Sequence, residues 1–296
     1  MPEPLFIGID GGGTNCRARL CDASGRRLGE GLGGRANLQL GPGVVMESIL
    51  AATRAAVAGK IAEADLDCVH AGFALAGTEL VEACRQLLAH PHPFASVVIE
   101  SDAYGALLGA HGGRDGAVLI LGTGSAGLAL VAGRRFRVSG YGAHIADEAS
   151  GFWIGREAIR RALWAHDGRA AMTPLAEAIL RRFENSSDAI VAFARKAEPA
   201  DFGDWAPRIF EYAGKRDPLA LAILTEAAAD AVRMIERLLE VGAPSVSLIG
   251  GLAGPLSNWL PRPICERLSP AKGDALDGAI LMARRASAAI PAAARA

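Results

Sequence analysis

The chain lacks the cysteine pattern of a disulfide-stabilised or cysteine-ligated metalloprotein. Its 296 residues include five cysteines, at positions 16, 21, 68, 84 and 265, an odd number that contains no C-x-x-C pair. Scattered thiols of this kind disfavour a disulfide framework and a zinc or iron-sulfur site, and they fit a reducing compartment. We therefore expect a cytoplasmic protein without a cysteine-bound metal.

A membrane span, an export signal and a nucleic-acid-binding patch are also absent from the sequence pattern. The longest uncharged stretch, 116–133, is interrupted by three glycines and predicts a β-hairpin instead of a membrane helix. The first residues include Glu3 and no basic-then-apolar signal segment. With a net charge of −1, a pI near 6.6 and no Lys/Arg cluster, the chain has no field that favours nucleic acid or anionic membrane. A small-molecule partner is expected, and a homodimer stays open.

Three common nucleotide-binding signatures are missing as well. No G-x-x-x-x-G-K-[ST] occurs, which excludes a P-loop enzyme. Residues 122–127 match G-x-G-x-x-G, but Leu-Ala-Leu-Val at 128–131 is typical of a strand where a dinucleotide-binding fold needs a helix. Neither H-R-D nor D-F-G follows a glycine loop, which excludes a protein kinase.

The sequence does contain a glycine-rich hairpin near its start, at Asp10-Gly11-Gly12-Gly13-Thr14. It lies between the apolar strand expected at 5–9 and the alternating strand expected at 15–20. Glycines adopt backbone angles closed to other residues and expose N–H groups to an anion, while Asp10 and Thr14 add a carboxylate and a hydroxyl. This arrangement suits a metal-bound phosphate, although an ordinary hairpin turn is favoured for the stretch in isolation.

A second hairpin of the same kind, Gly122-Thr123-Gly124-Ser125, lies between strands expected at 117–121 and 126–131. Two such hairpins facing each other across a cleft can hold a triphosphate without a lysine, because Mg²⁺ and backbone N–H dipoles balance the charge. The pair therefore points to nucleotide binding more strongly than either hairpin does alone.

The element order predicts an α/β fold with two lobes, and 51% hydrophobic residues suffice for two cores. For the first lobe we expect strands at 5–9, 15–20, 27–33, 67–75 and 96–100, with helices at 44–58, 77–90 and 103–111. For the second we expect strands at 117–121, 126–131, 136–139 and 245–249, a mostly helical region at 147–240 and a last helix at 274–289. The expected domains are 1–112, completed by a C-terminal helix at about 280–296, and 113–279.

Four acidic or amide residues are candidates for contact with a substrate. Asp102 follows a strand and precedes a helix, so it could accept a hydroxyl proton or equally well cap the helix. Asp147 and Glu148 could bind a polyhydroxylated substrate or stabilise the positive end of the next helix. Asn37 lies in a glycine-rich loop, where an Asx-turn role is commoner than a ligand role.

Gly250-Gly251 follows the strand expected at 245–249. The pair could allow close approach of the backbone to a flat adenine ring, or it could form a plain turn between a strand and a helix.

Together these residues resemble the superfamily of sugar kinases, heat-shock ATPases and actin. Residues 8–14, Gly-Ile-Asp-Gly-Gly-Gly-Thr, resemble its first phosphate motif; residues 121–125 resemble the second and residues 248–251 the adenosine motif. Within it the chain is similar to the N-acetylglucosamine kinase and BadF/BcrA-type ATPase branch, most closely to bacterial glucosamine kinases. The similarity runs nearly end to end, through 36–37, 74–77, 92–96, 101–105, 167–168, 173–175 and 217–220.

The resemblance implies a ribonuclease H-like, two-lobed fold that binds ATP and a sugar in the cleft between the lobes. It implies that Asp10 positions Mg²⁺ through water, that Asp102 is the general base, and that Asn37 and Asp147 bind sugar hydroxyls together with Asp102. The phosphates would be held by Gly11, Gly12, Gly13, Thr14, Gly122, Thr123 and Gly124, and Gly250 and Gly251 would lie against adenosine.

The expected activity is ATP- and Mg²⁺-dependent phosphorylation of the 6-hydroxyl of glucosamine. The Asp147-Glu148 pair resembles N-acetylglucosamine kinases, whereas Asp-Gln is expected of glucosamine kinases, so N-acetylglucosamine is the alternative acceptor. A sugar-sensing regulator or an ATPase activator is a third interpretation. The cluster-binding cysteines of the dehydratase activators are missing, which argues against that activity.

Overall fold

The computed structural model describes residues 3–289, which form two compact units. Unit 1 contains the described residues up to Arg114 and those from Ala271 onward, and unit 2 runs from Asp115 to Pro270. The chain therefore returns to unit 1 at Ala271, earlier than the boundary expected near residue 280, because the whole last helix packs on the sheet of unit 1. Residues 290–296 of the expected C-terminal helix lie outside the described residues.

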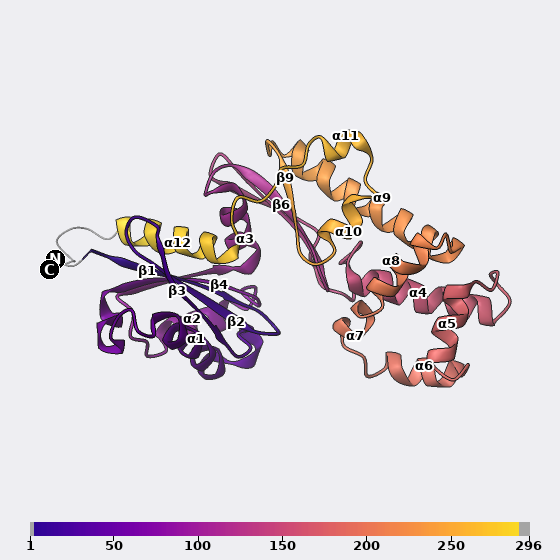
Figure 1. Ribbon diagram of the computed structural model, residues 1–296, viewed down its shortest axis with the longest axis horizontal. Coiled ribbons are helices and arrows are strands. Elements are labelled where there is room, and N and C mark those ends of the chain that lie inside the picture. The colour runs from indigo at the N-terminus through magenta and orange to yellow at the C-terminus, as the bar shows by residue number, and fades with distance from the viewer. Residues whose placement is uncertain (1–2, 290–296) are drawn as a thin grey trace. The chain divides into compact units, whose positions relative to one another are not determined.

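Unit 1 is built on a five-stranded sheet with the order β3-β2-β1-β4-β5 (Figure 1). Its strands are β1 (Leu5–Gly11), β2 (Cys16–Cys21), β3 (Arg27–Gly33), β4 (Val69–Leu75) and β5 (Ser96–Ser101). The first three form an antiparallel meander, while β4 and β5 run parallel to β1. These strands were predicted from the sequence, except that residues 63–68, which include the first two of the strand expected at 67–75, form the 3-10 helix η2 (Glu63–Cys68).

Helices cover both faces of this sheet (Figure 1). One face carries α1 (Pro42–Val57), which follows the 3-10 helix η1 (Leu38–Leu40), and α2 (Val81–Ala89). The other face carries α3 (Asp102–His111) and α12 (Ala275–Ala289). The main core lies beneath α1, where Ile7, Ile9 and Phe73 from the sheet are completely buried.

The helix α12 lies directly on the backbone of the sheet and of α3. A Cβ atom on Gly72 of β4 would come within 2.0 Å of the carbonyl oxygen of Ala279, and one on Gly278 within 1.8 Å of that of Gly105. Since real side-chain contacts are never this short, only glycine fits at these crossings. The segment after residue 270 is therefore an integral part of unit 1.

Unit 2 repeats the opening of unit 1 in a four-stranded sheet with the order β8-β7-β6-β9. Strands β6 (Gly116–Leu121), β7 (Ser125–Val131) and β8 (Arg134–Val138) form an antiparallel meander, and β9 (Val246–Ile249) runs parallel to β6. The two sheets thus place a glycine hairpin after the first strand of each unit, as the sequence predicts.

The rest of unit 2 is mostly helical, as predicted for 147–240. The helices are α4 (Gly151–His166), α5 (Pro174–Arg182), α6 (Ser187–Ala194), α7 (Pro199–Gly203), α8 (Ala206–Gly214), α9 (Pro218–Glu240), α10 (Ala253–Ser257) and α11 (Arg262–Cys265). Hydroxyl or carboxylate side chains at Ser150, Thr173, Ser186 and Asp217 cap four of them. The long helix α9 buries Ile223, Ala227, Ala231, Met234 and Leu238, a helical spacing, in the core of the unit.

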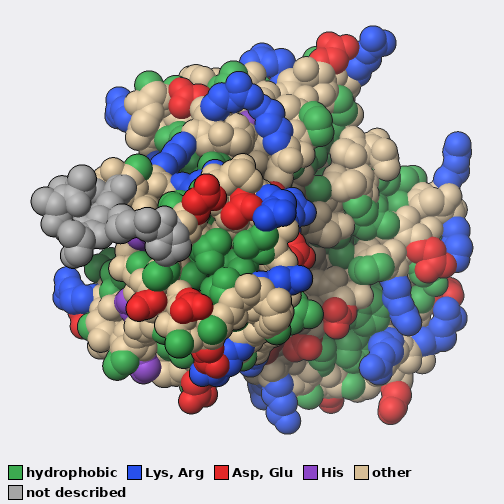
Figure 2. Space-filling view, turned by 60° about the vertical axis from the view of Figure 1, so that its left-hand side comes forward, with side chains coloured by type: hydrophobic (Ala, Val, Ile, Leu, Met, Phe, Trp, Pro, Cys, Tyr) green, Lys and Arg blue, Asp and Glu red, His purple; other side chains and the backbone are tan. Residues whose placement is uncertain are grey.

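Charged side chains of both signs are interspersed over the face shown in Figure 2, with no broad region of one sign. Within residues 3–289, no helix combines the length and the apolar composition that a membrane crossing requires.

Candidate active site

In unit 1 the parallel strands β1, β4 and β5 end at the same edge of the sheet. The strand register pairs Gly11 with Leu75 and Leu75 with Ser101, so the residues that follow these strands are neighbours. Ligands of open α/β sheets bind beyond the carboxyl ends of parallel strands. This edge carries Asp10 and the first hairpin, Asn37 through the bond from its neighbour Leu38 to Ala76, and Asp102.

The first hairpin is closed by its own backbone and open on its outer side. The N–H of Gly12 donates to the carbonyl of Asn15 at 3.0 Å, and a Cβ on either Gly12 or Gly13 would meet no atom within 4 Å. The N–H groups of Gly13 and Thr14 have no hydrogen-bond partner among the described residues. Such a turn can therefore offer free N–H donors to an anion such as a phosphate.

Two arginines, which the sequence analysis did not single out, flank this hairpin. Arg17 of β2 donates two hydrogen bonds to Oδ2 of Asp10, from Nε at 3.1 Å and from Nη2 at 2.5 Å. Arg35 donates from Nε to the carbonyl of Gly13 at 2.6 Å. The hairpin register was the available signal for Arg17, because pairing of Gly11 with Cys16 places Asp10 opposite Arg17.

The donor set at the hairpin fits Mg²⁺ and not a metal held wholly by protein. Among residues 3–289 no group of three or more His, Cys, Asp or Glu side chains could hold a metal ion. Mg²⁺ keeps several waters and binds through one or two carboxylates plus substrate phosphates. Asp10 supplies one carboxylate beside free N–H groups, so the metal would arrive with the nucleotide.

Asp102 occupies the first turn of α3, but it is not the residue that caps this helix. The cap is Ser101, whose hydroxyl accepts a hydrogen bond from the N–H of Tyr104 at 3.2 Å. The Asp102 carboxylate accepts a hydrogen bond through Oδ1 from the N–H of Ala103 at 2.7 Å, and no other residue that the structure describes bonds to Oδ2. The N-cap interpretation of Asp102 is therefore wrong, and one carboxylate oxygen is available for chemistry.

The surroundings of Asp102 favour its protonated form. Solvent reaches Asp102, but the surrounding protein limits the hydration of its carboxylate and raises its pKa. The carboxylates of Asp10 and Glu79 also raise this pKa, while the N–H groups of Ala103 and of Asp102 itself lower it. A raised pKa makes a carboxylate a stronger base, which is what proton transfer from a hydroxyl requires.

Asn37 has the Asx-turn role expected of it. Its Oδ1 accepts a hydrogen bond from the N–H of Gln39 at 2.9 Å and starts η1. A Cβ on Gly77, whose φ is +89°, would come within 2.8 Å of the same oxygen, so the two loops fit closely. The amide nitrogen of Asn37 has no partner among the described residues and can still donate to a ligand.

In unit 2 the second hairpin and the glycine pair after β9 meet at one sheet edge. Strands β6 and β9 are parallel neighbours, and the carbonyl of Leu121 accepts a hydrogen bond from the N–H of Leu252 at 3.0 Å. A Cβ on Gly250, with φ +101°, would come within 2.3 Å of this carbonyl, whereas one on Gly251 would meet nothing within 4 Å. Gly250 therefore forms the turn, and Gly251 leaves open space beside it.

The second hairpin turns its carbonyl groups toward α4. The N–H groups of Gly151 and Phe152 donate to the carbonyls of Gly122 and Thr123 at 2.8 and 3.0 Å. The hairpin N–H groups of Thr123 and Gly124 have no partner among the described residues. The helix thus fixes the hairpin and leaves its donors available for an anion.

Asp147 lies beneath the second hairpin and is buried, with 9% of its surface exposed. A Cβ on Gly124 would come within 2.7 Å of its Oδ2, and its φ of +63° is in the left-handed region. Burial raises the pKa of Asp147, while hydrogen bonds from the N–H groups of Gly142 and Ser125 lower it. In unit 2 by itself the carboxylate therefore supports the hairpin.

Ser150, and not Glu148, is the residue that caps the start of α4. The side chain of Glu148 accepts a hydrogen bond from the hydroxyl of Ser139 at 3.0 Å, and its carbonyl accepts one from Ser125 at 2.6 Å. Glu148 therefore ties the segment before α4 to the end of β8 and to the hairpin.

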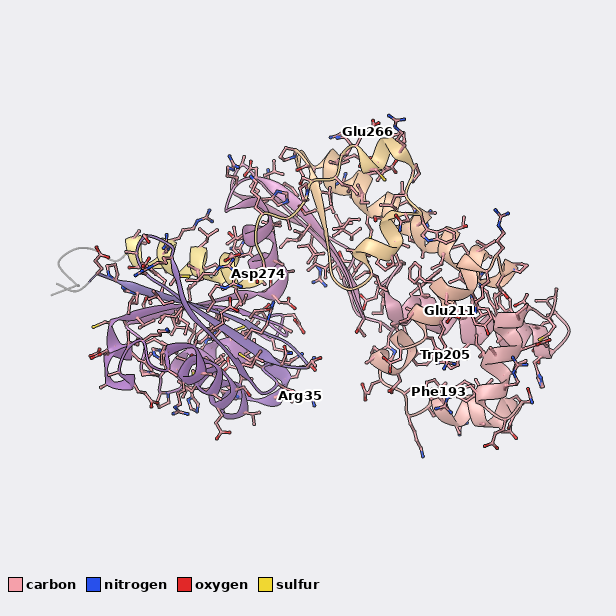
Figure 3. All side chains as sticks on the ribbon, in the orientation of Figure 1. Arg35, Phe193, Trp205, Glu211, Glu266 and Asp274 are labelled. Atoms are coloured by element: carbon pink, nitrogen blue, oxygen red, sulfur yellow. The ribbon has the colours of Figure 1, made fainter. Side chains whose placement is uncertain are left out.

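The predicted site residues fall into two groups, one in each unit. Unit 1 brings together Asp10, the first hairpin, Asn37 and Asp102; unit 2 brings together the second hairpin, Asp147 and the Gly250-Gly251 turn. A hollow of about 370 Å³ in unit 2, near Phe193 and Trp205 (Figure 3), is lined by residues of α5 to α8 and their connections and contains none of the predicted site residues.

Each α/β unit opens with an antiparallel meander and carries a glycine hairpin after its first strand. This pair of units defines a class of protein fold. It is the two-lobed, ribonuclease H-like fold of sugar kinases, Hsp70 ATPases and actin. A ROK-family glucokinase from Streptomyces griseus, solved with glucose and AMPPNP, has this fold at a TM-score of 0.54 and 21% identity, covering 95% of this chain and 99% of its own. Within the class, the profile of the BadF/BadG/BcrA/BcrD ATPase family matches residues 7–280, and the protein belongs to this family.

Two relatives are similar over almost their whole length. Glucosamine kinase of Vibrio cholerae is 40% identical over 279 residues, which are 94% of this chain and 95% of the relative. A Chromobacterium violaceum structure, provisionally named an N-acetylglucosamine kinase, matches with a TM-score of 0.87 and 35% identity over 95% of this chain and 99% of its own. The family resemblance drawn from the sequence is therefore confirmed, and with it the use of ATP.

Proposed function

We propose that the protein is a glucosamine kinase that transfers the γ-phosphoryl group of ATP to the 6-hydroxyl of the sugar. The similarity to a glucosamine kinase along 94% of the chain carries the proposal. The chemistry of the edge of unit 1 supports it, since Asp102 presents an unbonded carboxylate oxygen two strands away from the phosphate-type hairpin.

Each group of residues has a defined role in the proposed reaction. The free N–H groups of the two hairpins, residues 11–14 and 122–124, bind the phosphates, and the turn at Gly250 and Gly251 lies against adenosine. Mg²⁺, positioned through water by Asp10, would neutralise the charge of the phosphates. Asp102 accepts the proton of the sugar hydroxyl as that oxygen attacks, and positioning of the two substrates supplies most of the acceleration.

The sugar would be held by a small set of polar side chains. Asn37 donates from its amide nitrogen, which its turn leaves unpaired, and Asp102 accepts from the hydroxyl that reacts. Asp147 is proposed as a third contact to sugar hydroxyls. Its carboxylate would accept from them in addition to the hydrogen bonds that it accepts from the N–H groups of Gly142 and Ser125. The proposed use of ATP also implies a cytoplasmic location, in agreement with the unpaired cysteines.

N-acetylglucosamine is the second candidate acceptor. It is favoured by the 35% identity to the Chromobacterium protein and by the Asp147-Glu148 pair. The two acceptors differ by an acetyl group, so a pocket that fits one discriminates against the other by space and by hydrogen bonding.

The decisive test is ADP release across glucosamine, N-acetylglucosamine, N-acetylmuramic acid and glucose, each with ATP and Mg²⁺. We expect the highest kcat/KM with glucosamine and a product phosphorylated at the 6-position. A higher value with N-acetylglucosamine would replace the proposed acceptor, and no stimulation by any sugar would refute the kinase proposal.

A further inference from the structure

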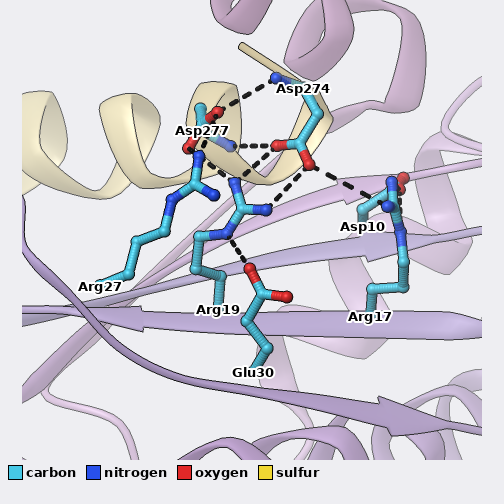
Figure 4. Close-up of polar contacts among 7 residues, drawn as sticks. All are labelled: Asp10, Arg17, Arg19, Arg27, Glu30, Asp274 and Asp277. Carbon is cyan, nitrogen blue, oxygen red and sulfur yellow. Dashed lines mark hydrogen bonds and ion pairs between the residues drawn. The ribbon is translucent and has the colours of Figure 1, made fainter.

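Arg17 lies between two carboxylates that come from distant parts of the chain (Figure 4). It donates both of its short hydrogen bonds to Oδ2 of Asp10, and its Nη1 lies 4.0 Å from Oδ2 of Asp274. Oδ1 of Asp10 has no hydrogen-bond partner among the described residues. The bonds of Arg17 therefore fix the Asp10 carboxylate by one oxygen and leave the other available.

Asp274 is held in place independently of Arg17. Its Oδ1 accepts a hydrogen bond from the N–H of Asp277 at 3.0 Å, and Oδ2 of Asp277 accepts one from the N–H of Asp274 at 3.1 Å, which is a reciprocal cap at the start of α12. Both Asp274 oxygens also accept from the guanidinium of Arg19, at 2.8 and 2.9 Å. Burial opposes ionisation, but these bonds lower the pKa of Asp274, so it is a fixed negative charge.

A guanidinium bonded to Asp10 has two opposing effects on a metal at that carboxylate. It orients the carboxylate, and its positive charge repels a dication at short range. A second carboxylate near the guanidinium reduces this repulsion without breaking the orienting bonds. Asp274 is placed to do so, and Arg17 has room to adjust, because it also borders a hollow of about 320 Å³ with Glu30 and Leu276.

We propose that Arg17 is a positioning residue for Asp10, and that Asp274 offsets the charge of Arg17 so that Asp10 can position Mg²⁺ with the nucleotide. The inference rests on the proposed function in one respect, namely that the protein binds ADP or ATP together with Mg²⁺. It adds two residues, one from β2 and one from the start of α12, that contact neither metal nor substrate and set the metal response of the site.

The chain provides a matched control for Asp274. Asp277 belongs to the same reciprocal cap and bonds Arg19 at 2.6 Å, but its second arginine is Arg27 and not Arg17. Asp274→Asn and Asp277→Asn therefore both weaken the cap and the Arg19 network, whereas only the first removes the charge beside Arg17.

The measurement is ADP binding by calorimetry, first without metal and then as Mg²⁺ is titrated. For Asp274→Asn we expect the Mg²⁺ concentration that half-maximally tightens ADP binding to rise roughly fivefold, the scale of one partly exposed ion pair. Asp277→Asn should stay within about twofold of the parent protein, as should metal-free ADP binding by both variants.

A double-mutant cycle with Arg17→Gln separates an effect through Arg17 from a direct effect of Asp274 on the metal. We expect the shift caused by Asp274→Asn to vanish in the Arg17→Gln background. A shift that persists there, or equal shifts for Asp274→Asn and Asp277→Asn, would overturn the proposal.

If Asp274→Asn does not fold, Arg17→Lys still tests the positioning role of Arg17. A single ammonium cannot replace both bonds of the guanidinium to Asp10, so the Mg²⁺ midpoint is expected to move, and an unchanged midpoint would overturn the proposal. If added Mg²⁺ does not change the ADP affinity of the parent protein, that result would instead contradict the proposed function itself.

Discussion

Replacing Asp102 by Asn tests the proposed general base with little disturbance of the fold. The Asn Oδ1 can keep the 2.7 Å bond from the N–H of Ala103, and the cap of α3 is provided by Ser101 and stays in place. Only the ability to accept a proton is removed. Loss of a general base lowers rates by about 10²–10⁴, which corresponds to about 3–5.5 kcal/mol of transition-state stabilisation.

The stability of the variant is expected to move in the opposite direction. Because the raised pKa of Asp102 means that the folded protein disfavours its charged form, this carboxylate opposes folding at neutral pH and stops doing so below its ordinary pKa. The Asn variant should therefore melt at the same temperature as the parent protein or slightly higher. If Asp102 had only a structural role, the Asn variant would instead melt at a lower temperature and keep its turnover rate.

Steady-state ADP release and thermal unfolding, measured side by side, decide the matter. Asp188→Asn is the matched control, since Asp188 occupies the first turn of α6 behind the serine cap of that helix and is expected to keep the parental kcat. Activity is lost as the pH falls through the raised pKa of Asp102. The acid limb of the parental kcat/KM profile should therefore lie at a higher pH than the ordinary pKa of an aspartate, which is about 4. A kcat for Asp102→Asn within about threefold of the parent, far short of a general-base loss, would refute the assignment.

Three further substitutions test separate parts of the structure. Gly250→Ala is expected to lower the free energy of unfolding by about 2–4 kcal/mol, because the left-handed φ and the contact with the Leu121 carbonyl both oppose a side chain. The control Gly251→Ala should unfold like the parent protein in urea. Equal losses of stability for the two variants would contradict the geometry of the turn. Arg19→Met removes a buried guanidinium that bonds three carboxylates and should destabilise the protein by about 3–5 kcal/mol in the same assay; a variant of unchanged stability would show that the network contributes little. Asp10→Ala should abolish Mg²⁺-dependent ATP use while calorimetry still detects sugar binding, and retained turnover with Mg²⁺·ATP would count against the metal role of Asp10.

Local features of the fold were predictable from the sequence because they depend on neighbouring residues. Alternating and apolar runs around glycine turns located both meanders, and strand-to-helix order located the parallel strands. Boundaries were less accurate where two local signals compete. The helix expected from Gly77 begins at Val81, because Gly77 has a φ of +89° and the chain turns before the helix starts.

The candidate site was predictable where a single residue type carries the signal, and not where distant residues meet. Glycine hairpins and a carboxylate after a strand could be found by inspection. The contacts of Arg17 with Asp10 and Asp274 depend on strand register and on a segment more than 250 positions away in sequence. The burial of Asp147 beneath Gly124 depends on two left-handed residues, Asp147 and Ala149, that no local pattern announces.

The place of α12 in the chain has a consequence for synthesis. Unit 2 is continuous from Asp115 to Pro270, so it emerges from the ribosome ahead of α12. The sheet of unit 1 is completed later, because residues of α12, among them Leu276, Ala279 and Ile280, pack against its backbone at Gly8 and Gly72. We therefore expect the part of this sheet face that α12 covers to stay exposed to chaperones until the second half of the chain has emerged.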